Sequence, residues 1–153
     1  MRFFLIDRIT RWEVGKAAEA RKNVALSEDF FDDHFPRRPV MPGVLIIEGM
    51  AQLSGLLLEA SLRERFGKNA KAILTILDKV KFRDLVKPGE TLVYTTELTS
   101  LNEVSGKVSV QATREGRLIA ATGMVFSFKD VDDPTLDGKR RALLDLWLGK
   151  HDA

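Results

Sequence analysis

The feature that most constrains the fold is a long apolar segment, from Gly43 to about Phe66, that contains no proline. Pro42 comes directly before it, and proline suits the first turn of a helix because its missing N–H would have no partner there. Gly67 follows it, and glycine commonly ends helices. At ~1.5 Å per residue the predicted helix is about 36 Å long. A lone helix of this length must bury its apolar side chains, and only a sheet curled around it is large enough to cover them.

Strands are predicted on both sides of this helix. Residues 3–12 and 17–26 come before it, separated by a turn at Gly15-Lys16, and residues 27–38 have the composition of a loop. The predicted strands after the helix are 72–77, 80–82, 91–99, 107–113 and 117–128. The connections are too short for parallel crossovers, so we expect these pieces to form an antiparallel meander.

This order of elements is that of a hotdog fold, in the α+β class. We expect an antiparallel sheet of about five to six strands, wrapped around one long central helix, with a short C-terminal helix added. Residues 1–130 would form the hotdog domain. Residues 131–153 would be an extension, with a polar linker over 130–137 and a helix over 139–148. The apolar face expected to anchor this helix consists of Leu143, Leu144, Leu146, Trp147 and Leu148.

Composition excludes several classes of protein. The 153 residues suffice for one domain, and they include no cysteine and only two histidines, which leaves no basis for a disulfide scaffold or a zinc site. A net charge of +2 does not indicate a nucleic-acid binder. The longest uncharged stretch, 118–128, is shorter than the roughly 20 residues of a membrane span. The apolar run Phe3–Ile6 is too short for a secretory signal, so we expect a cytoplasmic protein without a membrane partner.

Two residues with catalytic side chains flank the start of the predicted helix. His34 lies in a loop stiffened by prolines, and Glu48 lies in an apolar run where burial would favour its protonated form. A base beside a protonated acid suits the elimination of water, because one group removes a proton next to a carbonyl and the other protonates the leaving hydroxyl. The first helical amides, at Gly43 and Val44, are free to hydrogen-bond that carbonyl oxygen.

The same helix also fits a purely structural interpretation. Five residues fall near one face at helical spacing and would form a solvent-facing stripe: Glu48, Gln52, Gly55, Glu59 and Arg63. In that case His34 would be a loop residue without a catalytic role.

The segment from His34 to Glu48 reads HFPRRPVMPGVLIIE. It resembles HFPxxPxMPGVLxxE, the signature of the FabZ-type β-hydroxyacyl-acyl carrier protein dehydratases. The resemblance continues through Ala51-Gln52, through FLIDR at 4–8, KFR at 81–83 and VKPGE at 86–90, and spans roughly residues 3–128. Asp33 and Arg37 stand where the family usually has glycine, and Asp84 replaces a basic residue.

The resemblance implies a role for each residue of the motif. His34 would be the base for the α-proton, Glu48 the acid for the β-hydroxyl, and the Gly43 amide would hold the thioester carbonyl. Val44 and Gln52 would also contact substrate, with Gln52 bracing Glu48. No metal and no organic cofactor is expected.

The resemblance also implies partners. Two copies would form a homodimer with a continuous sheet, in which His34 and Glu48 from different subunits meet beside an apolar acyl tunnel; trimers of dimers are common in the family. The substrate would be a 3-hydroxyacyl-phosphopantetheine on an acidic acyl carrier protein. Five basic residues are expected to dock that carrier: Arg37, Arg38, Lys79, Lys81 and Arg83. From charge alone, a solvated basic face is the alternative.

Two other functions remain open at this point. A hotdog thioesterase would hydrolyse the same thioester with a carboxylate-activated water, and would be detected by free acid. A non-catalytic subunit would bind the acyl carrier and shape a partner enzyme's tunnel. The presence of both His34 and Glu48 favours the dehydratase over either.

Overall fold

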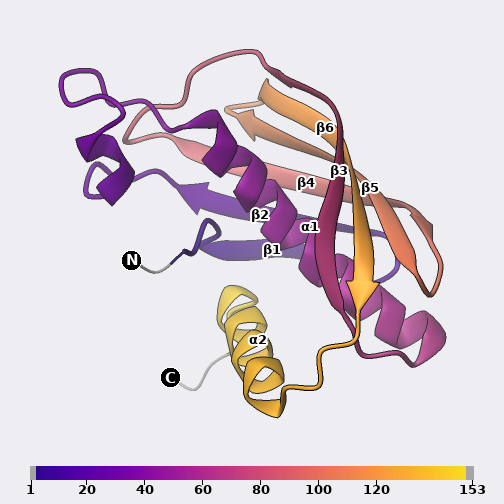
Figure 1. Ribbon diagram of the computed structural model, residues 1–153. Helices are drawn as coiled ribbons and strands as arrows, with labels where there is room; N and C mark the ends of the chain where they lie inside the picture. The colour runs from indigo at the N-terminus through magenta and orange to yellow at the C-terminus, as the bar shows by residue number, and fades with distance from the viewer. Residues whose placement is uncertain (1–2, 151–153) are drawn as a thin grey trace.

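The computed structural model describes residues 3–150 and consists of one curved sheet around one long helix (Figure 1). The strands are β1 (Arg8–Glu13), β2 (Ala17–Asn23), β3 (Lys71–Phe82), β4 (Thr91–Leu101), β5 (Ser105–Arg114) and β6 (Arg117–Lys129). The helices are a 3-10 turn, η1 (Asp29–Asp32), the central helix α1 (Gly43–Phe66) and the C-terminal helix α2 (Pro134–Trp147). The predicted hotdog architecture is confirmed.

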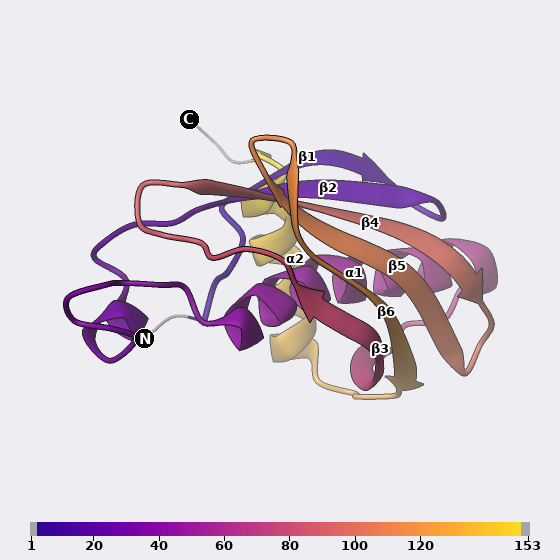
Figure 2. The same cartoon turned by 90° about the horizontal axis from the view of Figure 1, so that it is seen from above.

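Helix α1 has the predicted boundaries. Pro42 is its N-cap, and Gly67 ends it with a φ of 65°, donating its amide to the Arg63 carbonyl over 2.9 Å. By length and composition alone α1 could cross a membrane, but most of it lies inside the sheet, as the core helix of a folded domain does. Figure 2 shows the sheet bent over one side of α1, with α2 beyond the opposite side.

The sheet order is β1-β2-β4-β5-β6-β3, with every neighbouring pair antiparallel. The predicted meander is therefore right for β4, β5 and β6 but wrong for β3. After α1 the chain enters the sheet at its far edge, where β3 pairs with β6 instead of β4. The two short strands predicted at 72–77 and 80–82 are one strand, because the ladder resumes after an irregularity between Asp78 and Lys81.

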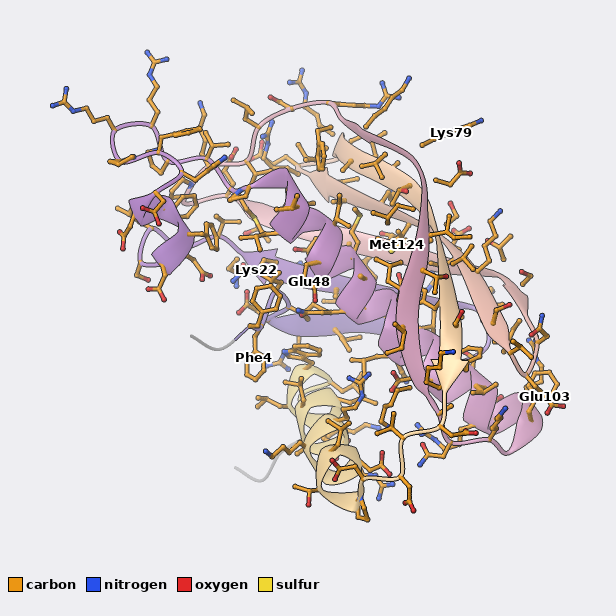
Figure 3. The ribbon with its side chains drawn as sticks, in the orientation of Figure 1. Phe4, Lys22, Glu48, Lys79, Glu103 and Met124 are labelled. Carbon is orange, nitrogen blue, oxygen red and sulfur yellow. The ribbon has the colours of Figure 1, made fainter. Side chains whose placement is uncertain are left out.

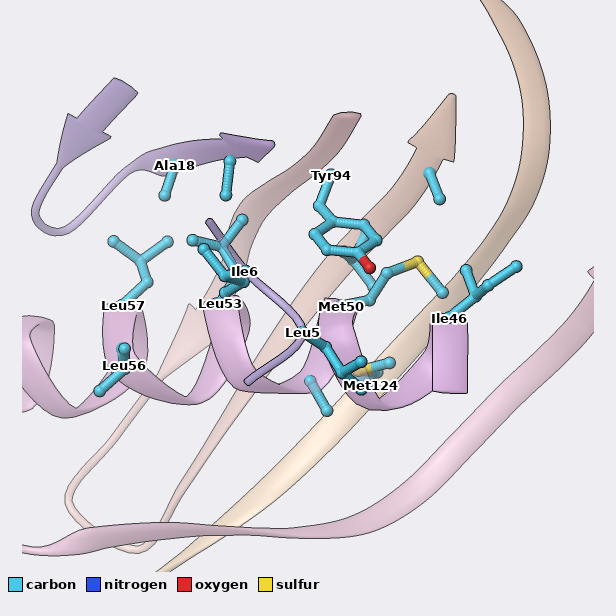
Figure 4. Packing of buried hydrophobic residues seen from close by; sticks show 14 of the residues in the cluster. Leu5, Ile6, Ala18, Ile46, Met50, Leu53, Leu56, Leu57, Tyr94 and Met124 are labelled. Carbon is cyan, nitrogen blue, oxygen red and sulfur yellow. The ribbon is translucent and has the colours of Figure 1, made fainter. Parts of the chain in front are cut away.

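The core lies between the concave face of the sheet and α1 (Figure 4). The predicted alternation holds on β4, where Leu92, Tyr94 and Thr96 are buried, and on β5, where Val108, Val110 and Ala112 are buried. The period of two along a strand explains why these side chains share one face.

The first strand is shorter than predicted and starts at Arg8. The segment before it meets α1 instead of another strand: the Leu5 amide donates to the Gln52 side chain over 3.2 Å, and the Phe3 carbonyl accepts from it over 3.0 Å. The second strand ends at Asn23, and the predicted loop over 27–38 contains η1.

Helix α2 begins earlier than predicted, inside what the sequence indicated as a polar linker. Asp133 caps it by accepting from the amides of Thr135 and Leu136, and Pro134 occupies its first turn. Trp147 is buried and packs edge-on against Phe4, with 5.9 Å between the ring centroids. Leu143, Leu144 and Leu148 are partly buried against the core, as predicted, but Leu146 is exposed, so the predicted apolar face is wrong at that position.

Candidate active site

His34 is held in place by the loop that leads into α1. Its Nδ1 lies 2.8 Å from the Val40 carbonyl oxygen, and its backbone carbonyl accepts from the Val40 amide over 2.9 Å. A carbonyl only accepts, so Nδ1 bears the hydrogen, and Nε2 of the neutral ring is left with a free lone pair. This tautomer can take up a proton at Nε2. Asp33, at the position usually held by glycine, has a φ of −108°, which any residue adopts without strain.

Glu48 lies one turn into α1 and is half-buried. Gln52, one turn further on, donates from Nε2 to Glu48 Oε1 over 3.3 Å. Because Gln52 Oε1 accepts from the Leu5 amide, its NH₂ group must face Glu48. The predicted contact between Gln52 and Glu48 is therefore present, and within residues 3–150 Oε2 of Glu48 has no hydrogen-bond partner.

The amides that begin α1 are placed close to an aromatic ring. A Cβ on Gly43 would lie 2.7 Å from Cζ of Phe82, so the Phe82 ring occupies its present position because residue 43 has no side chain. Within residues 3–150 the amides of Gly43 and Val44 have no acceptor. They are thus available to a carbonyl oxygen bearing developing negative charge.

An apolar cavity of about 410 Å³ lies beside Glu48. One wall is the face of α1 from Glu48 to Leu56, and the opposite walls come from Phe3 and Phe4, from β3 and from α2. Figure 3 shows Glu48 on the side of α1 that faces Phe4 and α2. This volume is within the range of small-molecule sites.

The burial of Glu48, Gln52, Gly55 and Glu59 excludes the interpretation that this face of α1 is a solvent-facing stripe. Glu59 is buried, Gly55 is buried, and Glu48 and Gln52 are half-buried, so this face is no solvent stripe; of the five residues only Arg63 is exposed. The sequence could not show this, because the residues that cover the face come from segments far away in the chain, namely Phe3 and Phe4, β3, β6 and α2.

The remaining predicted site residues lie apart from the cavity. His34 is not part of its lining, and the five basic residues are exposed on two separate segments, the loop before α1 and the end of β3. Of the residues that line the cavity, only Glu48 and Gln52 belonged to the site predicted from the sequence. The lining residues that the prediction missed include Arg140, Leu143 and Trp147 of α2. The i, i+4 spacing of Leu143 and Trp147 was the available signal, but it indicated only packing.

Comparisons with known proteins identify the family to which the chain belongs. Residues 1–123 match the family model described as a FabA-like domain. The chain is 43% identical over 127 residues to 3-hydroxyacyl-[acyl-carrier-protein] dehydratase FabZ of Caldicellulosiruptor bescii, covering 83% of this chain and 89% of the relative. It is 38% identical over 129 residues to the dehydratase of the same name from Listeria monocytogenes, covering 84% and 88%.

Solved structures support the fold. The dehydratase heterocomplex ApeI:P from Xenorhabdus doucetiae matches with a TM-score of 0.65 at 15% identity, covering 90% of each chain. A hypothetical thioesterase from Streptococcus pneumoniae, solved with coenzyme A, matches with a TM-score of 0.62 at 12% identity, covering 82% of this chain and 88% of that one. At these identities the likeness extends to the architecture alone.

Proposed function

The chain belongs to the FabA-like family, among the FabZ 3-hydroxyacyl-[acyl-carrier-protein] dehydratases, and we propose that it is such an enzyme itself. It removes water from a (3R)-hydroxyacyl thioester on an acyl carrier protein and leaves the trans-2-enoyl thioester, in fatty acid biosynthesis. The observation that carries the proposal is the position of Glu48, the one carboxyl group on the cavity wall within residues 3–150. We place the reaction in the cytoplasm.

The chemistry divides between two side chains. Nε2 of His34 takes the proton from C2 of the substrate, and the electron pair of that C–H bond forms the C2–C3 double bond. The C3–O bond breaks as Oε2 of Glu48 gives its proton to the departing hydroxyl, which leaves as water. Transfer of the proton from His34 back to Glu48 resets the site. The amides of Gly43 and Val44 stabilise the thioester oxygen while the α-proton leaves.

We further propose that the working unit is a homodimer formed through the free edge of β3. This strand pairs only with β6 among the described residues, and Ile73, Ile76 and Leu77 are exposed along it. A long apolar edge of this kind favours pairing with another strand. Ile73 also lines the Glu48 cavity, so a second copy at this edge would stand where His34 of that copy could complete the site.

The test is incubation of the purified protein with a 3-hydroxyacyl carrier substrate and detection of the loss of one water by mass. Replacing His34→Ala or Glu48→Gln is expected to lower kcat/KM by ~10²–10⁴. Glu64→Gln, an exposed carboxyl on the same helix, is the matched control and is expected to leave the rate unchanged. Full activity in either site variant would contradict the mechanism. Release of free acid would indicate a thioesterase, and binding without turnover a non-catalytic subunit.

A further inference from the structure

Helix α2 is a part of this chain that the family match does not include. The match ends at residue 123, and α2 begins at Pro134. Even so, α2 supplies Arg140, Leu143 and Trp147 to the wall of the Glu48 cavity. An element outside the common domain therefore shapes the space beside the acid.

The position of α2 is fixed by contacts at several points along its length. Asp137 accepts from Nζ of Lys71 over 2.5 Å, and Arg140 donates to Oε2 of Glu59 over 2.5 Å. Lys71 and Glu59 are both buried, so each ion pair joins α2 to a charge that is shielded from water. Glu59 Oε2 also accepts from the Ala72 amide over 2.9 Å, which fixes the carboxylate that Arg140 meets. Together with the ring contact between Phe4 and Trp147, these ion pairs hold α2 in a fixed position at the side of the cavity.

The cavity runs along α1 from Glu48 to Leu56, a distance of about 12 Å at the rise of an α-helix. A substrate whose C3 hydroxyl reaches Glu48 would extend its acyl chain along this face. The carboxylate of Glu59 neutralises Arg140, so what α2 presents to such a chain is mainly the apolar surface of Leu143 and Trp147.

We propose that α2 is a specificity element, in which Leu143 and Trp147 limit the length of the aliphatic acyl chain that fits beside Glu48. This inference rests on the proposed function, since it assumes an acyl substrate in that cavity. It goes further by assigning substrate selection to a helix outside the family domain.

The experiment compares kcat/KM across 3-hydroxyacyl carrier substrates from four to sixteen carbons. Leu143→Ala enlarges the cavity and is expected to raise the ratio of long-chain to short-chain kcat/KM by about tenfold or more, since one methylene group in an apolar pocket is worth ~10–200-fold. Leu143→Phe fills the cavity and is expected to lower the same ratio. Leu144→Ala is the matched control, because Leu144 is the same residue type on the same helix, packs against the core, and does not line this cavity.

Binding gives a second measurement that does not need catalysis. In a Trp12→Phe background Trp147 is the remaining tryptophan, and its emission is expected to change when a saturated acyl carrier protein of fitting length binds. The parent protein could be active while the Leu143 variants show the same chain-length preference as Leu144→Ala. That result would overturn the role of α2 and leave the proposed function standing. A parent that releases water from no substrate would contradict the proposed function. Even then, the Trp147 emission could change with acyl chain length, and Leu143→Ala could shift the length that gives the largest change. That result would still support α2 as a wall of the acyl site, and no change in emission would refute this role of α2.

Discussion

At the scale of single residues, Gly49 of α1 packs directly against the hydroxyl group of Tyr94. A Cβ on Gly49 would lie 2.3 Å from the Tyr94 hydroxyl oxygen, so only glycine lets β4 lie this near α1 (Figure 4). That hydroxyl is buried and, within residues 3–150, has no hydrogen-bond partner; burial raises the pKa of Tyr94 far above its usual value. The strand pattern predicted that Tyr94 faces inward, but no pattern along one strand identifies the helix residue that it meets.

We expect Tyr94→Phe to stabilise the protein. The unpaired hydroxyl loses its contacts with water on folding and gains nothing in exchange, which costs ~1–3 kcal/mol. Removing it should raise the free energy of unfolding by about 1 kcal/mol in urea titrations. Gly49→Ala, which forces a methyl group into the same space, should be strongly destabilising. A Tyr94→Phe protein less stable than the parent would show that the hydroxyl has a partner in solution.

At the scale of elements, the sequence predicts boundaries well where backbone chemistry marks them. Pro42 and Gly67 fix both ends of α1, and each acts through its own backbone. The start of α2 carried a signal of the same kind, Asp133 followed by Pro134, but the acidic residues around it favoured a linker interpretation. The contacts that dock α2 depend on residues far away in the chain, and spacing within a helix does not identify them.

The ion pair that docks α2 predicts a pH dependence. The hydrogen bond from Lys71 lowers the pKa of Asp137 below its ordinary 3.8, so this pair stabilises the fold at neutral pH and loses its effect as acid protonates the carboxyl. The parent should have a higher Tm than Asp137→Asn from about pH 7 down to about pH 5. The difference in Tm between the parent and Asp137→Asn should become smaller below about pH 4 and vanish once Asp137 is protonated in the folded protein.

Asp132→Asn serves as the control for this series, since Asp132 is exposed and outside the helix. It should leave Tm close to that of the parent at every pH. A gap between parent and Asp137→Asn that stays constant into strong acid would mean that the substitution acts through packing and not through the charge of Asp137.

At the scale of the whole molecule, the sequence predicts the strands but not which strand lies beside which. The residue patterns of β3 and β4 each predict a strand, but they do not predict the crossover that places β3 beyond β6 in the sheet. That crossover is what leaves the apolar edge of β3 open. Likewise, His34 and Glu48 could be chosen from the motif, whereas the motif does not show that His34 lies outside the lining of the cavity beside Glu48.

The exposed basic residues predict how the carrier protein is recognised. A joint Arg38→Glu, Lys81→Glu change should raise KM for a carrier-bound substrate and leave kcat/KM for a small thioester mimic almost unchanged. Each exposed ion pair is worth ~1 kcal/mol or less, so single changes should be mild. Lys107→Glu with Lys129→Glu makes the same change in net charge at exposed sites elsewhere and should have little effect. Equal loss with both substrates would show that these residues do not dock the carrier.

The proposed sharing of the active site between two subunits makes a prediction that depends on both copies of the chain. If His34 of one subunit works with Glu48 of the other, His34→Ala and Glu48→Gln homodimers are both inactive, but a mixed dimer holds one site with both natural residues. Its second site lacks both. One of the two sites in each mixed dimer is intact, so isolated mixed dimers should have about half of the activity of the parent, and an unseparated random mixture about a quarter.

The mixed dimers should be isolated through two different affinity tags, so that their composition is known before the rate is measured. Ile76→Lys, placed on the exposed edge of β3, should oppose dimer formation and abolish the recovery, because it puts a charge where two apolar strand edges would meet. Sedimentation of that variant should show a monomer. Verified mixed dimers without activity would mean that each site draws His34 and Glu48 from one chain, and the loop before α1 would then have to close over its own cavity to bring Nε2 of His34 to the substrate.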